Sequence, residues 1–212
     1  MAGTKQFLTF SQQVDYLKSE KEIAVSDDQF AEEILQRIGY FALMGGYKEL
    51  FRIPFTKKYK PGTSFDEIVA LYQFDAELRE LFLKYLLQIE RHIGNLIAHY
   101  FVEAHGISQA EYMNPNNYNN SSRNRKIITG LLRKLHGAVT TTDYSHVNYY
   151  RTKYGNIPLW ITTNVLTFGS LSKMYNVLEQ SLRSKICRHF SNVNQRQLER
   201  FLSVLTKYRN VC

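Results

Sequence analysis

The residues best suited to chemistry in this 212-residue chain are arginines and lysines of its second half. They form three clusters: Arg123, Arg125, Lys126, Arg133 and Lys134; Arg183, Lys185 and Arg188; Arg196, Arg200 and Lys207. The last three are spaced i, i+4 and i+11, which places them on one side of a helix. Such clusters suit contacts to nucleic-acid phosphates, and they also occur as solvated faces that bind nothing.

Arg209 differs from these clusters because it continues an apolar stripe. Leu198, Leu202 and Leu205 recur along the last predicted helix, and Arg209 follows at i+4 spacing. A permanently charged guanidinium on the inward side of a helix needs a partner or an interface, since burying an unpaired charge is costly. Glu90, at the border of an apolar face in an earlier helix, is a candidate partner for a basic group of the last helix. An arginine at a fraying helix end remains the simpler alternative.

Other side chains offer nucleic-acid contacts but no standard catalytic motif. Arg91 points away from the apolar face of its helix, so it is either solvated or a further RNA contact. Tyrosines in polar segments suit stacking on unpaired bases, namely Tyr118, Tyr144, Tyr149 and Tyr150. There is no P-loop, no GxGxxG, no GxSxG and no CxxC.

Metal and cofactor sites are not expected. His92 and His99 lie seven residues apart, about 10.5 Å along a helix, which is too far to share one ion. The two cysteines, Cys187 and Cys212, cannot build a disulfide framework and fit a reducing, cytoplasmic setting. The longest nearly apolar stretch, residues 38–47, is much shorter than a membrane span and contains three glycines. We therefore expect no metal, no small-molecule cofactor, no membrane partner and a cytoplasmic location.

The charge of the chain is concentrated in one half. There are 27 Lys and Arg against 19 Asp and Glu, a formal net charge of +8. Residues 1–111 carry 12 basic and 16 acidic side chains, whereas residues 112–212 carry 15 basic and 3 acidic ones. This asymmetry indicates a polyanionic partner or pairing between the two halves.

Hydrophobic periodicity predicts that helices position these residues. Ser64 and Glu67 form a capping box, after which apolar residues recur with a 3.6-residue period to Ile97, as one helix or as two joined near Asp75. Further helices are predicted over residues 27–38, 125–135, 158–190 (interrupted at 168–170) and 194–212, with a polar loop over 137–158. We predict a mainly α protein whose helices form a bundle.

Four segments, taken in order, carry a family resemblance. They are FLTFSQQVDYLKSEKEI with ILQRIGYFALMGGY, GTSFDEIVALYQFDAELRELFLKYLLQIERHIGNLIAHYF, IPLWITTNVLTFGSLSKMY, and LERFLSVLTKYRNVC. They resemble the Abi-like family of bacterial abortive-infection proteins, a branch of the HEPN superfamily of helical ribonucleases and RNA-binding proteins. The resemblance implies a HEPN-like helical bundle over residues 61–212, truncated at its C-terminus, with an N-terminal helical extension over residues 1–60.

The resemblance also implies a chemistry and a site. It places Arg209 and Asn210 at the start of a motif of the form R-N-x-C-x-H, whose histidine would fall two positions beyond Cys212. The implied activity is metal-independent RNA cleavage, in which the ribose 2′-OH attacks the adjacent phosphate, a histidine moves protons and an arginine stabilises the phosphorane. The family commonly dimerises with these residues facing each other, which implies a homodimer through the C-terminal helices. Because the histidine is absent, we expect little cleavage by this chain.

Two alternatives to a ribonuclease remain open. The same basic clusters fit a non-catalytic protein that holds a regulatory RNA, with binding that weakens steeply as salt rises. The charge asymmetry also fits a protein–protein module in which the acidic half of one chain meets the basic half of another.

Overall fold

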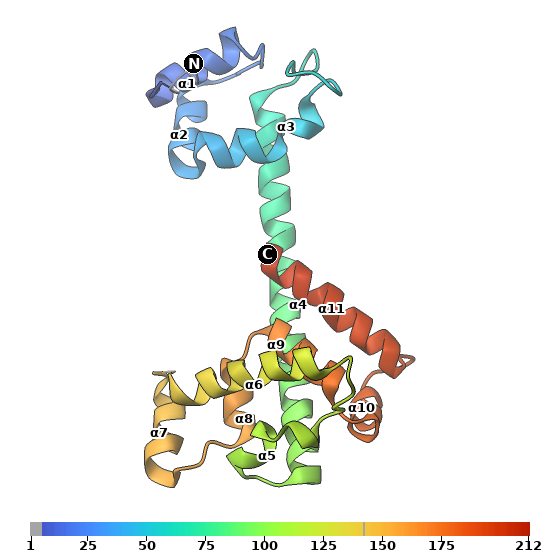
Figure 1. Cartoon of the computed structure of the whole chain (residues 1–212). Coiled ribbons are helices and arrows are strands. Elements are labelled where there is room, and N and C mark those ends of the chain that lie inside the picture. The colour runs from blue at the N-terminus through green and yellow to red at the C-terminus, as the bar shows by residue number, and fades with distance from the viewer. Residues whose placement is uncertain (1–5, 142) are drawn as a thin grey trace. The chain divides into compact units, whose positions relative to one another are not determined.

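The computed structural model describes residues 6–141 and 143–212, and these form eleven α-helices with no strand. The helices are α1 (Phe10–Ser19), α2 (Asp28–Ile38), α3 (Gly46–Phe51), α4 (Phe65–His105), α5 (Gln109–Met113), α6 (Arg125–Thr140), α7 (Ser145–Tyr154), α8 (Leu159–Thr162), α9 (Phe168–Val177), α10 (Gln180–Cys187) and α11 (Gln195–Val211). A π-helical segment, η1 (Phe41–Gly45), leads into α3, and short 3-10 helices, η2 (Pro115–Asn117) and η3 (Thr163–Val165), connect others (Figure 1). The prediction of a mainly α bundle is confirmed.

The chain divides into two compact units, Met1–Arg79 and Glu80–Cys212, whose boundary lies within α4. The predicted capping box begins this helix, since Ser64 Oγ accepts from the Glu67 N–H and Glu67 Oε2 accepts from the Ser64 N–H. The helix then continues to His105 without a break, so α4 is one helix rather than two. None of the described helices combines the length and the apolar character that a membrane crossing requires.

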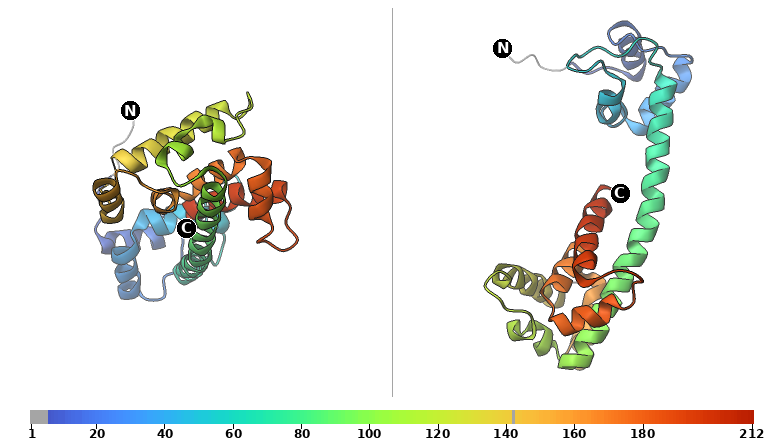
Figure 2. Two further views of the ribbon diagram at one scale, coloured as in Figure 1. Left: turned by 90° about the horizontal axis from the view of Figure 1, so that it is seen from below. Right: turned by 90° about the vertical axis from the view of Figure 1, so that its right-hand side faces the viewer.

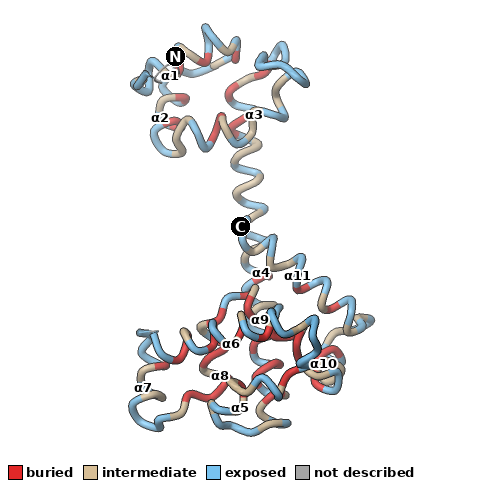
Figure 3. Tube along the Cα trace, viewed as in Figure 1, coloured by how far each residue is buried: buried red, intermediate tan, exposed pale blue. Residues whose placement is uncertain are grey.

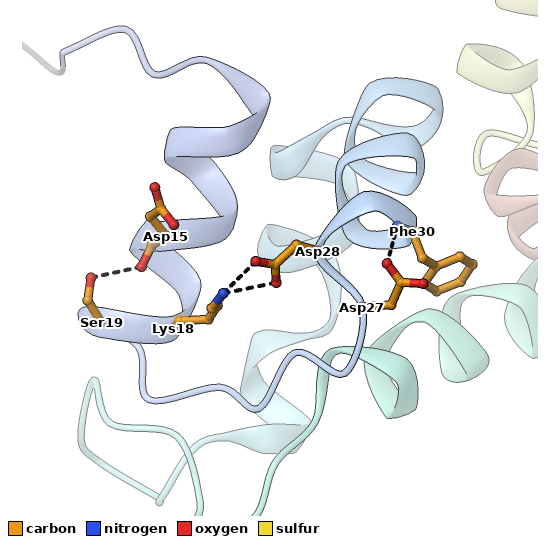
Figure 4. Close-up of polar contacts among 6 residues, drawn as sticks. All are labelled: Asp15, Lys18, Ser19, Asp27, Asp28 and Phe30. Carbon is orange, nitrogen blue, oxygen red and sulfur yellow. Dashed lines mark hydrogen bonds and ion pairs between the residues drawn. The ribbon is translucent and has the colours of Figure 1, made fainter.

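The first unit is held by caps, ion pairs and a small core. Asp27 Oδ1 caps α2 by accepting from the Phe30 N–H at 3.0 Å, as the sequence predicted for a start at residues 26–27. Lys18 of α1 reaches Asp28 of α2 at 2.7 Å (Figure 4). Most buried apolar side chains of the unit come from α1, α2, η1 and the start of α4, and they include Leu17, Leu35, Leu43, Phe65 and Ile68.

The second unit has a larger core, in which α9 is the most buried helix (Figure 3). Its side chains Phe168, Leu171, Met174 and Tyr175 are at most 1% exposed. Helix α9 packs against both α6 and α11 (Figures 1 and 2). Helix α11 also meets α4 through the stacked rings of Tyr208 and Phe82. The α9 layer therefore positions α6 on one side and α11 on the other.

Three predictions in the second unit are wrong. The helix predicted to run on from the 168–170 break to residue 190 is two helices, α9 and α10, because the backbone is extended at Leu178 and Glu179. The segment 137–158, predicted as a loop, contains α7, whose single buried residue is Val147, so the helix has almost no apolar period to detect. The break predicted at 168–170 lies one turn earlier, because Thr167 Oγ1 caps α9 by accepting from the Ser170 N–H. Gly169 is thus inside the helix. A Cβ there would lie 3.3 Å from Thr206 Cγ2, so the glycine allows α11 to approach α9 closely.

Candidate functional site

Helix α11 holds Arg209 in the position that the leucine stripe predicted. The helix begins with a capping box, in which Asn194 Oδ1 accepts from the Gln197 N–H and Gln197 Oε1 accepts from the Asn194 N–H. Leu198 and Leu202 are buried and Leu205 is partly buried against the core. This anchoring fixes which side of α11 faces the core of the unit, and Arg209 lies on that side at i+4 from Leu205.

Arg209 is paired with Glu90 of α4. Its Nε–H donates to Glu90 Oε2 at 3.4 Å, and the carboxylate side chain is 14% exposed whereas the arginine side chain is 42% exposed. The prediction that Glu90 pairs with a basic group of the last helix is confirmed. Among the described residues only Nε of this guanidinium has a hydrogen-bond partner, so the donors on Nη1 and Nη2 are available to a ligand.

Both residues line a cavity of about 360 Å³, which we call the Arg209 cavity. Its wall is built by α4, by the turn that precedes α9, and by α11, and its polar lining includes Glu90, Arg91, Asn95, Asn164, Thr167 and Arg209. Gly94 forms part of the floor, where a Cβ would lie 3.4 Å from Leu171 Cδ1, so α4 lies close to α9 there. Two arginines against one carboxylate give the cavity a net positive lining.

The chemistry that this lining supports is recognition of an anion with polar neighbours. Two guanidinium groups present planar forks of N–H donors that match phosphate oxygens, while Asn95 and Asn164 supply amide donors and acceptors. The volume lies at the lower end of the range for small-ligand sites, which suits one phosphate with its attached sugar or base. Asn210, the second predicted catalytic residue, is exposed on α11 and does not line the cavity.

The predicted RNA-binding residues are separated by the fold into three places. Arg91 lines the Arg209 cavity. Arg123, Lys126 and Lys134 line a second cavity of about 390 Å³ between α6 and α9, which we call the α6–α9 groove. The remaining ones are exposed and line neither cavity: Arg125 and Arg133 on α6, and Arg196, Arg200 and Lys207 on α11.

The tyrosines proposed for base stacking also separate. Tyr118 is 3% exposed and its hydroxyl donates to the Tyr112 carbonyl at 2.7 Å, so its predicted exposure is wrong. Burial raises the pKa of its phenol far above the usual value. Tyr149 and Tyr144 are 49% and 58% exposed, and Tyr144 lines the Arg209 cavity.

Sequence reasoning missed some lining residues. Lys173 of α9 faces the α6–α9 groove, and Asn95 and Asn164 face the Arg209 cavity. None of the three belongs to a basic cluster or an apolar stripe in the sequence, so only the packing of the helices brings them to a site. No group of three or more His, Cys, Asp or Glu side chains suited to a metal ion occurs within the described ranges.

The fold and the site together define an all-helical protein with a small cationic cavity suited to a phosphate-bearing ligand. The family model described as Abi-like protein matches residues 33–212, and the chain belongs to this family. Membership makes it a protein of the abortive-infection type. No curated protein and no solved structure matches the chain.

Proposed function

We propose that this Abi-like protein is a HEPN-type module that acts on RNA in the cytoplasm and that the Arg209 cavity is where it contacts the phosphate to be cleaved. The observation that carries the proposal is the placement of Arg209. An arginine that a leucine stripe and Glu90 hold at the rim of a cavity, with its terminal nitrogens unpaired, is a preorganised donor for an anion.

The reaction is a transesterification that needs no metal. The ribose 2′-oxygen forms a bond to the adjacent phosphorus, and the bond from phosphorus to the 5′-oxygen breaks, leaving a 2′,3′-cyclic phosphate and a 5′-hydroxyl. Negative charge accumulates on the non-bridging oxygens in the transition state, where the Arg209 Nη donors stabilise it. A proton must leave the 2′-oxygen, and another must reach the leaving 5′-oxygen. In the family pattern these proton transfers belong to a histidine two positions after Cys212.

The other residues of the cavity have supporting parts. Glu90 is a positioning residue, because its bond to Nε fixes the plane of the guanidinium and leaves the opposite edge free. Arg91 neutralises a neighbouring phosphate, and Tyr144 offers a ring on which a base can stack. The strongly basic balance of residues 112–212 supports a polyanionic substrate.

We also propose a homodimer through the C-terminal helices. Exposed apolar side chains gather on α11 and on the facing part of α4: Leu81, Phe82, Tyr85, Phe201, Val204, Tyr208 and Val211. Light scattering after gel filtration is expected to give twice the chain mass, falling to the chain mass in Phe201→Ser/Tyr208→Ser. Phe74→Ser alters an aromatic residue of the first unit that is 62% exposed; it is the control and is expected to leave the dimer intact.

The activity is tested by completing the family pattern. A two-residue Ala-His extension after Cys212 restores R-N-x-C-x-H, and it is expected to cleave single-stranded RNA in the presence of EDTA. Arg209→Ala in the extended chain is expected to lose this cleavage, while Arg37→Ala, which alters an exposed arginine of α2 that lines neither cavity, retains it. Equal cleavage with and without Arg209, or none on any RNA, contradicts the proposal.

A further inference from the structure

All the charged residues that line the α6–α9 groove are basic. Arg123, Lys126 and Lys134 come from α6 and the residues just before it, and Lys173 comes from α9. No Asp or Glu lines it. The floor is formed by Ile127, Gly130 and Leu131, so the groove combines four positive charges with an apolar base.

These four cations have no carboxylate partner among the described residues. Two basic residues of α10, by contrast, are each paired with a carboxylate. Lys185 reaches Glu103 at 2.7 Å, and Arg183 reaches Glu199 at 2.6 Å. In the groove only Lys134 has a side-chain partner, donating from Nζ to Ser170 Oγ at 3.3 Å. Unneutralised like charges that share one groove repel one another, and an anion in that groove relieves the repulsion.

The groove and the Arg209 cavity lie on either side of the first turn of α9. Thr167 lines the Arg209 cavity and Ser170 lines the groove, and their hydroxyl oxygens are 3.0 Å apart. Lys134, Ser170 and Thr167 thus form one chain of hydrogen bonds that leads from the groove to the cavity. Ser170 is 2% exposed, so the polar side chains of this chain that an extended ligand can reach are Lys134 and Thr167.

The floor of the groove is open where a ligand must approach. A Cβ added to Gly130 would meet nothing within 4 Å, although the residue lies in the middle of α6. A helix interior does not need glycine, because alanine is more favourable there by about 1 kcal/mol. The missing side chain therefore leaves space between the four cations that no other part of the described chain fills.

We propose that the α6–α9 groove binds phosphates of the same single-stranded RNA whose neighbouring nucleotide occupies the Arg209 cavity, an inference that rests on the proposed function. Arg123, Lys126, Lys134 and Lys173 neutralise the backbone, and the apolar floor packs against sugars. The groove thereby sets the course of the strand toward the cavity. Lys173, which the sequence clusters did not include, becomes part of the RNA contact.

The experiment measures the affinity of the full chain for a fluorescent 12-nucleotide unstructured RNA by anisotropy, between 50 and 200 mM NaCl. Each lost phosphate contact lowers the salt slope by about 0.7, so Lys126→Gln/Lys173→Gln is expected to lower it by about 1.4. Across this fourfold salt range, the affinity of the unaltered chain is then expected to fall about 7-fold more than that of the variant. Lys57→Gln/Lys58→Gln, which removes the same charge from exposed residues of the first unit, is expected to leave the slope unchanged.

A second variant tests the groove without altering charge. Gly130→Met fills the open floor and is expected to preserve the helical circular dichroism spectrum while weakening RNA binding. The groove assignment is overturned if both groove variants bind as the control does, or if the unaltered chain does not bind the RNA. Failure of the proposed function looks different, because the groove variants then weaken binding while the Ala-His-extended chain cuts no RNA. Conversely, the groove variants could bind RNA as the unaltered chain does while cleavage still depends on Arg209. That outcome contradicts the groove proposal alone and leaves the proposed activity standing.

Discussion

The ion pair between Arg209 and Glu90 can be weighed by a double-mutant cycle. The changes are Arg209→Gln, Glu90→Gln and the two combined, which remove one or both charges while keeping side chains of similar length. The pair joins α11 to α4 within the second unit, and Glu90 is 14% exposed. Removing the arginine alone leaves a mostly buried carboxylate without its partner, so the cycle is expected to show positive coupling.

The size of the coupling follows from the geometry. At 3.4 Å and an effective dielectric constant of about 20, the direct attraction is about 5 kcal/mol. Desolvation of the carboxylate, ordering of the long arginine side chain and screening of a guanidinium that is 42% exposed offset most of this. We expect a net coupling of about 1 kcal/mol in the free energy of unfolding, decreasing as salt rises.

The assay is urea unfolding at 25 °C followed by fluorescence of Trp160, the single tryptophan, which lies in the second unit. The matched control cycle uses Lys185 and Glu103, an α10–α4 pair at 2.7 Å whose side chains are about half exposed. Its coupling is expected to be clearly smaller despite the shorter distance. A coupling for Arg209 and Glu90 that is no larger than the control would refute the view that Glu90 positions the arginine.

Three further predictions concern the core of the second unit. Burial raises the pKa of Tyr112 to about 12 from its usual 10, so the stability that this phenol supports is present below pH 10 and is lost as pH rises toward 12. Between pH 10 and 11.5, the unfolding free energy of the unaltered chain is expected to decrease with pH more steeply than that of Tyr112→Phe, by about 1.4 kcal/mol per pH unit. Urea unfolding at several pH values measures both slopes. Burial also raises the pKa of the Cys187 thiol, so a thiol reagent at pH 8 is expected to label Cys212 quickly and Cys187 only on unfolding, and equal rates would contradict this. Leu202→Ala, at a side chain 1% exposed, is expected to cost about 3 kcal/mol of unfolding free energy, against less than about 0.5 kcal/mol for Ile107→Ala, which is 55% exposed.

Local signals predicted the helices that carry strong caps and apolar periods. The Ser64–Glu67 capping box and the long apolar period located α4, and the leucine stripe located α11 with Arg209 on its inward side. Helix α7 escaped prediction because its stability comes from neighbours rather than from an amphipathic pattern, with Val147 as its one buried side chain. Gly169 was taken as a helix break, whereas its role is the close contact of α9 with Thr206 of α11.

The sequence predicted a site residue only where the pattern of its own helix marks it. Arg209 stood out because a charge on an apolar stripe is costly, and that cost also pointed to a partner such as Glu90. Lys173 and Asn164 carry no such local signal. They join Lys134 and Arg91 through the packing of α9 between α6 and α11, a long-range contact that periodicity does not encode.

The most direct test of the proposed activity is the chemistry of the RNA ends. The chain extended by Ala-His is incubated with a defined single-stranded RNA in EDTA, and the products are analysed by mass spectrometry. Attack by the 2′-oxygen at the Arg209 cavity predicts 2′,3′-cyclic phosphate and 5′-hydroxyl ends, lost in Arg209→Ala and lost when the nucleotide at the cut carries a 2′-deoxyribose. Products with 3′-hydroxyl ends, cleavage of the 2′-deoxy position, or an unaltered RNA would contradict the account.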